Sequence, residues 1–215
     1  MVDKAPPSPL QRFTLGMGGK MHGDDAGAWV RYEDVRPFLS AKISRTWAMP
    51  ASDTFDCKPI GEFVRRYLQG VSVDPFARDK RWATHTNDLN PATQAEHHMD
   101  AEAFLAMLAD RGVVADCIIL DPPYSPRQIS ECYAADGLKA GMKDTQNAAL
   151  YARVRRSARR LCKHGTVVLS FGWNSAGMGS EGEMLELLLV AHGGAHNDTI
   201  CLAERMNMQQ MELAA

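Results

Sequence analysis

The segment VVADCIILDPPYSP at residues 113–126 joins two kinds of sequence that together indicate the fold. Its first eight residues form a nearly continuous apolar run rich in branched side chains, which is typical of a strand buried on both faces of a parallel sheet. Pro122 and Pro123 follow at once, and neither a strand ladder nor a helix continues through such a pair. The pattern predicts a central strand over residues 113–120 with a rigid loop at its carboxyl end.

On either side of this strand, short apolar runs alternate with stretches of helical spacing. Asp100 is suited to cap the start of one predicted helix, and Gly112 to end it. Such alternation predicts an α/β fold with a mostly parallel central sheet and helices on both faces. Helices are expected at 59–70, 100–112, 147–165 and 182–194, and further strands at 71–76, 83–89, 166–173 and 197–205.

The N-terminal part of the chain differs in composition from the rest. It is rich in Pro, Gly and Met, which predicts a partly flexible extension over residues 1–45 followed by a single domain over residues 46–210. No apolar run approaches the roughly 20 residues that span a bilayer. Because the N-terminus also lacks the apolar core of a secretory signal, we expect a cytoplasmic protein with no membrane partner.

The charge balance limits the kinds of partner that the chain attracts. A net charge of −2 does not fit a general polyanion binder. A local basic stretch is equally compatible with phosphate contact and with a solvated helix face. It contains Arg153, Arg155, Arg156, Arg159 and Arg160.

Cysteine and histidine spacing does not indicate a metal site or a disulfide framework. The five cysteines are scattered, without a CxxC pair. The pairs His97/His98 and His192/His196 have no third and fourth ligand at a characteristic spacing. We therefore expect no metal.

The tetrapeptide Asp121-Pro122-Pro123-Tyr124 has a composition suited to chemistry on an aromatic amine. The nitrogen of such an amine is a poor nucleophile because its lone pair is delocalised into the ring. The Asp121 carboxylate can accept a hydrogen bond from the NH2 group, and the Pro122 carbonyl can accept the second. Tyr124 offers a flat face for stacking a base, and the prolines hold the groups in place.

DPPY after a hydrophobic strand resembles the catalytic motif of S-adenosylmethionine-dependent amino-methyltransferases, which act on adenine N6 or cytosine N4. Relatives acting on cytosine more often have Ser at the first position, so Asp121 favours adenine. More narrowly, the chain resembles small phage and prophage adenine-specific DNA methyltransferases. The resemblance covers roughly residues 50–205 and implies a Rossmann-like class I methyltransferase fold, located in the host cytoplasm if phage-encoded.

The resemblance also implies a set of residues that bind S-adenosylmethionine. VSVDPFARD resembles the family's DPFxGxG loop, although Arg78 and Asp79 replace the glycine-rich turn, which normally lets the backbone approach a ligand closely. Asp88 corresponds to the acidic residue that holds the ribose hydroxyls. Asp100 corresponds to a contact to the cofactor's adenine, or it only caps its helix. The implied cofactor-binding residues are Phe55, Lys58, Asp74, Pro75, Phe76, Ala77, Asp88 and Asp100.

The family's mechanism is direct in-line methyl transfer to a base flipped out of the DNA stack. The implied catalytic residues are Asp121, Pro122, Pro123 and Tyr124. Too few residues lie between DPPY and the next predicted helix for a separate recognition domain, so this loop, residues 1–50 or a homodimer is expected to assist DNA binding. Candidate substrate-binding residues are Arg127, Lys139, Lys143 and Trp173.

Alternative functions remain open at the level of sequence. They are a cytosine-N4 DNA methyltransferase, an amino-methyltransferase of RNA or free nucleotides, and two kinds of phage-encoded protein without catalysis: a methyltransferase-like nucleic-acid-binding module and a structural or interaction protein. Asp74 and Asp88 argue against the binding module, because such a module would be expected to lose its acidic cofactor residues. Only the N-terminal segment suggests the structural protein.

Overall fold

The structure is a computed structural model that describes residues 13–15, 21–23, 41–123, 147–194 and 196–208. The chain divides into two units, residues 1–41 and residues 42–215. In the first unit, β1 (Phe13–Leu15) pairs antiparallel with β2 (Met21–Gly23).

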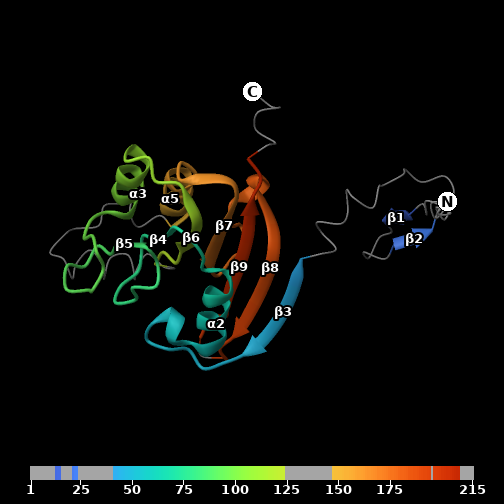
Figure 1. Cartoon of the computed structure of the whole chain (residues 1–215). Coiled ribbons are helices and arrows are strands. Elements are labelled where there is room, and N and C mark those ends of the chain that lie inside the picture. Colours follow the sequence, from blue (N-terminus) through green and yellow to red (C-terminus); the bar gives the residue numbers. More distant parts are fainter. Residues whose placement is uncertain (1–12, 16–20, 24–40, 124–146, 195, 209–215) are drawn as a thin grey trace, which may run out of the picture. The chain divides into compact units, whose positions relative to one another are not determined.

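The second unit is built on one seven-stranded sheet (Figure 1). The strand order is β3-β8-β9-β7-β6-β4-β5, and β9 alone runs antiparallel to its neighbours. The expected mostly parallel sheet is therefore confirmed. The strands are β3 (Lys42–Trp47), β4 (Ser72–Asp74), β5 (His85–Thr86), β6 (Ala115–Leu120), β7 (Cys162–Gly172), β8 (Gly182–Ala191) and β9 (Thr199–Met206). β3 begins at Lys42, so the sheet includes residues that the sequence analysis assigned to the extension.

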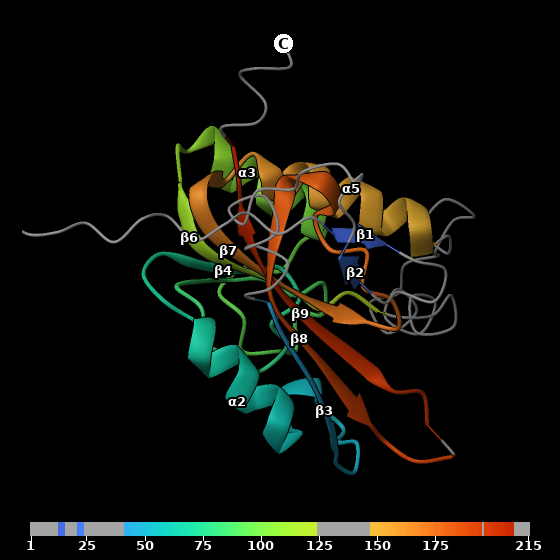
Figure 2. The same cartoon turned by 90° about the vertical axis from the view of Figure 1, so that its right-hand side faces the viewer.

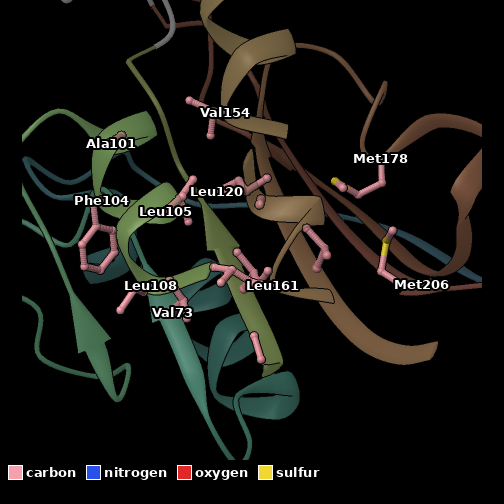
Figure 3. Close-up of a cluster of buried hydrophobic side chains, with 14 of the residues drawn as sticks. Val73, Ala101, Phe104, Leu105, Leu108, Leu120, Val154, Leu161, Met178 and Met206 are labelled. Carbon is pink, nitrogen blue, oxygen red and sulfur yellow. The ribbon is translucent and has the colours of Figure 1, made fainter. Parts of the chain in front are cut away.

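Helices cover both faces of the sheet (Figure 2). α2 (Lys58–Tyr67) and the short 3-10 helix η1 (Thr54–Asp56) pack on one face. α3 (Ala101–Asp110) and α5 (Asn147–Arg159) pack on the other, where Figure 3 shows the apolar side chains between them and the sheet. A second 3-10 helix, η2 (Gly179–Glu181), precedes β8. This is a Rossmann-like α/β architecture.

The strand β6 shows why residues 117–120 are apolar throughout. Ile118 and Leu120 belong to the core cluster under α3 and α5, whereas Cys117 and Ile119 belong to the cluster under α2. All four side chains are at most 1% exposed. Side chains alternate across a strand, so a strand covered on both faces requires apolar residues at every position. The prediction of a doubly buried central strand is confirmed.

The predicted helix at 182–194 is wrong, because this segment forms β8. Its leucines favour a helix, but tertiary pairing overrides such propensity. β8 lies between β3 and β9, and Leu188 and Val190 alternate into the α2 face. Glu186 on the same face accepts hydrogen bonds from Arg66 and Tyr67 of α2 and forms an ion pair with Lys42 of β3. These contacts require the period of two that only a strand provides.

The predicted helix at 147–165 is too long. α5 ends at Arg159, and β7 already begins at Cys162. Gly165 has a positive φ of 92°, but it lies near the start of β7 rather than at a helix end. There the Thr166 hydroxyl donates to the Ala115 carbonyl and accepts from the Lys163 N–H. In the described part of the chain, no helix is long and apolar enough to cross a membrane.

Candidate functional site

Three of the acidic residues singled out from the sequence lie at one edge of the sheet. Asp74 is the last residue of β4, Asp88 lies just beyond β5, and Asp121 follows the last residue of β6. These strands are parallel neighbours, so their carboxyl ends share an edge. Open α/β sheets bind their ligands beyond this edge.

Asp74 is the most deeply buried of these carboxyl groups, at 1% exposure. Burial raises its pKa well above the ordinary value, and the charges of Asp121, Asp88 and Asp53 raise it further, while the N–H of Phe76 opposes them. The structure thus brings four carboxyl groups within electrostatic reach of one another. A cationic ligand among them would relieve this repulsion.

The loop after β4 is held by main-chain hydrogen bonds. The Phe76 N–H donates to Asp74 Oδ1 at 3.0 Å, and the Ala77 N–H donates to the Asn87 carbonyl at 2.8 Å. Pro75 and Ala77 are buried. The predicted cofactor loop is therefore a fixed turn joined to the end of β5.

Arg78 occupies the position where the DPFxGxG pattern has its first glycine. Its φ is +50°, a left-handed conformation that favours glycine and costs an L-residue roughly 1 kcal/mol. The Arg78 N–H donates to Asp88 Oδ2 at 3.0 Å, and its guanidinium donates to the Ser52 carbonyl at 3.0 Å. Arg78 thus holds a left-handed backbone conformation that its contacts to Asp88 and Ser52 support.

Asn87 is a positioning residue that the sequence analysis did not identify. It is fully buried, and its side-chain amide donates to the carbonyls of Pro75 and Met99. Its Oδ1 accepts from the Met99 N–H at 3.1 Å. Asn87 therefore connects the loop after β4 with the segment that leads into α3. An Asn directly before the acidic residue at the end of a short strand was the available sequence signal.

The tetrapeptide at residues 121–124, predicted to be catalytic, is described only in part. Pro122 is buried and Asp121 and Pro123 are half-buried, whereas Tyr124 lies outside the described residues. A second residue missed from the sequence, Tyr151 of α5, lies nearby. Its hydroxyl donates to the Phe171 carbonyl at 2.6 Å, and burial together with the Asp121 charge raises its pKa. Tyr151 thus anchors the end of β7 beside the motif.

The remaining predicted cofactor residues are dispersed. Phe55 is buried and stacks on Trp82 with ring centroids 5.8 Å apart, so its side chain belongs to the core cluster under α2. The Lys58 side chain is 85% exposed beside Glu62 and is not brought to the carboxylates. Asp100 caps α3 by accepting from the N–H groups of Glu102 and Ala103. The capping role is present, and a contact to a cofactor stays a prediction.

The candidate substrate residues can be placed only in one case. Trp173 follows β7 and is 47% exposed. Together with Arg78 it lines a cavity of about 400 Å³ at the same edge of the sheet. Arg127, Lys139 and Lys143 lie outside the described residues.

The basic stretch on α5 is largely engaged within the protein. Arg153, Arg159 and Arg160 form ion pairs with Glu102, Glu181 and Asp110, respectively. Arg155 donates to the Gly177 carbonyl at 2.7 Å. These contacts favour a structural role over phosphate contact.

Within the described ranges, no group of three or more His, Cys, Asp or Glu side chains is placed to hold a metal ion. The four cysteines that the structure describes, Cys57, Cys117, Cys162 and Cys201, are free thiols.

The fold and the candidate site together define a Rossmann-like α/β protein with three carboxylates at the carboxyl edge of its sheet. Its sequence matches no protein-family model and no curated protein.

Comparison with solved structures finds methyltransferase candidates at low similarity. SMU.776, a candidate methyltransferase complexed with SAH, has 13% identity and a TM-score of 0.42, with 94% of this chain and 58% of that one covered. The candidate methyltransferase yhhF from Escherichia coli has 12% identity and a TM-score of 0.40, with coverages of 73% and 88%. A candidate SAM-dependent methyltransferase from Streptococcus mutans has 13% identity and a TM-score of 0.38, with coverages of 94% and 57%. The chain spans less than two thirds of the first and third of these proteins.

Proposed function

We propose that the chain is an S-adenosylmethionine-dependent methyltransferase of class I fold that methylates the exocyclic N6 amine of adenine in DNA. The observation that carries the proposal is the gathering of Asp74, Asp88 and Asp121 beyond neighbouring parallel strands, with the pKa of Asp74 raised by burial and by the other carboxyl groups. The DPPY motif at the end of β6 favours methyl transfer to an aromatic amine as the chemistry at this edge of the sheet.

The residues fit S-adenosylmethionine in charge and in hydrogen bonding. A sulfonium cation beside Asp74 would offset the repulsion among the carboxyl groups. Asp88 accepts one backbone N–H at each carboxylate oxygen, from Arg78 and from Asn90. A carboxylate accepts about four hydrogen bonds, so these two donors do not preclude ribose hydroxyls as further donors.

The role of each residue follows from this arrangement. S-adenosylmethionine, when bound, supplies a methyl group already activated on a sulfonium. Asp121 accepts a hydrogen bond from the adenine amine and the Pro122 carbonyl accepts a second, which aligns the nitrogen lone pair with that methyl group. Asn87 and Tyr151 act as positioning residues, since one holds the loop beside Asp88 and the other holds the end of β7.

Two carboxylates near opposite ends of β6, Asp121 and Asp116, provide the test. Asp121→Ala removes the acceptor for the amine, and we expect at least a hundredfold loss of methyl transfer to DNA with cofactor affinity within about threefold of wild type. Asp116→Asn is the matched control, because Asp116 lies near the opposite end of β6, where it accepts from the Val71 N–H and pairs with Lys163. It should retain full transfer. Methyl transfer is measured with labelled cofactor, and cofactor affinity is measured by calorimetry. An Asp121→Ala variant as active as wild type would refute the role given to this carboxylate.

A further inference from the structure

A second binding feature lies beside the proposed catalytic site, in the cavity of about 400 Å³ that Trp173 and Arg78 line. Its walls come from the segment after β3, the start of α2, the loops after β4 and β7, and the connection between β8 and β9. Its volume falls within the range of small-ligand pockets, which begins at about 300 Å³. We call it the hairpin pocket.

The hairpin pocket offers groups suited to a nucleotide. Trp173 presents a flat indole that is 47% exposed, on which a base can stack. Arg78 supplies a guanidinium, which suits phosphate. His196 and Asn197 add hydrogen-bonding groups able to read the edge of a base.

The floor of the hairpin pocket is rigid. His192 is 6% exposed, and its Nδ1 lies 2.8 Å from the Ala48 carbonyl oxygen. Since a carbonyl only accepts, Nδ1 donates this bond, and Nε2 lies within hydrogen-bond distance of the Thr199 hydroxyl at 2.9 Å. This histidine ties the end of β3 to both strands of the β8–β9 hairpin. The pocket is therefore preorganised rather than assembled by the ligand.

Arg78 connects the hairpin pocket with the carboxylate edge. Its N–H bonds Asp88 on the proposed cofactor side, while its guanidinium reaches the Ser52 carbonyl at the pocket. A left-handed conformation at a position where glycine would be unstrained indicates that the side chain itself has a role. The same residue thus borders two ligand sites.

Asp121, Pro122 and Pro123 are not among the residues that line the hairpin pocket. A base whose amine contacts Asp121 therefore lies outside it, although Trp173 at the end of neighbouring β7 brings the two sites close in the fold. We propose that the hairpin pocket binds a second nucleotide of the substrate DNA strand, next to the target adenine, and so contributes to sequence recognition. This inference rests on the proposed function.

Two measurements on the full chain test the inference. The first is equilibrium binding of a fluorescently labelled single-stranded oligodeoxynucleotide by anisotropy, without any transfer step. We expect Trp173→Ala and Arg78→Gly each to weaken binding at least tenfold, with Trp173→Phe close to wild type. Arg78→Gly keeps the turn because glycine prefers this φ. Trp47→Ala removes another exposed tryptophan, outside the hairpin pocket, and should bind as wild type does.

The second measurement compares methyl transfer to the oligodeoxynucleotide and to adenosine monophosphate. Wild type should show a KM at least tenfold lower for the oligodeoxynucleotide, and Trp173→Ala should abolish this preference while cofactor affinity stays unchanged. Equal affinity of Trp173→Ala, Arg78→Gly and wild type for the oligodeoxynucleotide would overturn the inference. Tighter binding of a ribo-oligonucleotide of the same base sequence than of the oligodeoxynucleotide would also overturn it. Binding that depends on Trp173 and Arg78 without any methyl transfer would instead sustain the pocket and refute the proposed function.

Discussion

At the scale of single residues, Asp74 is the buried acidic residue at the carboxyl edge of the sheet. Its carboxyl group is buried, and three other aspartates interact with it through space. Such a group costs folding free energy when it is ionised, because burial disfavours charge. At a site that binds a cation, the bound ligand stabilises the ionised carboxyl group and so offsets this loss of folding free energy.

Asp74→Asn should therefore separate stability from binding. The amide oxygen can still accept from the Phe76 N–H, so the loop keeps its geometry. The folded-state pKa of Asp74 is raised, so wild type loses stability as pH rises from the ordinary carboxyl range towards that raised value. The variant lacks this loss and should be the more stable protein at neutral pH. Its affinity for S-adenosylmethionine should fall roughly ten- to hundredfold, since hydrogen bonds to charged groups contribute about 1.5–3 kcal/mol.

Chemical denaturation at several pH values, with cofactor titration by calorimetry, checks both parts. A variant that binds the cofactor as tightly as wild type would remove Asp74 from the proposed site.

At this scale, the sequence indicated candidate site residues but not the residues that hold the surrounding loops in place. Asp74, Asp88 and Asp121 could be singled out because each lies near the carboxyl end of a predicted strand and matches a position of the family pattern, and their roles stay predictions. Asn87 and Tyr151 could not, since their partners lie in segments distant in sequence. The family pattern also named Lys58, whose side chain lies in the first turn of α2 and is exposed to solvent, so its contact to a cofactor stays a prediction.

At the scale of elements, β9 holds the loop that follows β7. Glu204 of β9 accepts from the Met178 N–H at 2.7 Å, and a Cβ on Gly177 or Gly182 would collide with its carboxylate. Burial raises the pKa of Glu204 to about 7, although the Met178 N–H and Arg155 lower it. The loop carrying Trp173 is thus fastened at its far end by a carboxyl group that titrates near neutrality.

Glu204→Gln should change the pH dependence of stability. The raised folded-state pKa means that wild type is progressively destabilised as pH rises from about 4.5 to above 7, by an upper limit of about 3 kcal/mol. Glutamine can still accept the Met178 N–H but does not ionise. The variant should therefore match or exceed wild type in free energy of unfolding at pH 8, and the difference should shrink towards pH 4.5. Urea denaturation across this range measures it; parallel pH profiles for the two proteins would contradict the assignment.

Elements were predictable where local pattern and tertiary environment agree. β6 and α3 meet that condition, because one is apolar at every position except Asp116 and the other has both a cap and a glycine end. β8 does not: its leucine-rich sequence favours a helix, and only pairing with β3 and β9 makes it a strand. A short apolar run bounded by Gly182 and Gly193 was the signal for a strand.

At the scale of the whole molecule, the sheet order explains how the two proposed ligand sites come to be adjacent. β4, β5 and β6 form one half of the carboxyl edge, while β7, β8 and the start of β9 form the other. The carboxylates gather on the first half and the hairpin pocket lies towards the second. The sequence predicted the alternation that builds such a sheet, but not its strand order, since that depends on contacts between distant segments.

We propose that the site at the carboxyl edge of the sheet transfers a methyl group to adenine N6 in DNA. The most direct measurement is incubation of the full chain with methyl-labelled S-adenosylmethionine and double-stranded DNA, followed by digestion to nucleosides and mass spectrometry. We expect label in N6-methyldeoxyadenosine, and none when Asp121 is replaced by Ala. Label in N4-methyldeoxycytidine, or label that appears only with RNA or free nucleotides, would contradict the account.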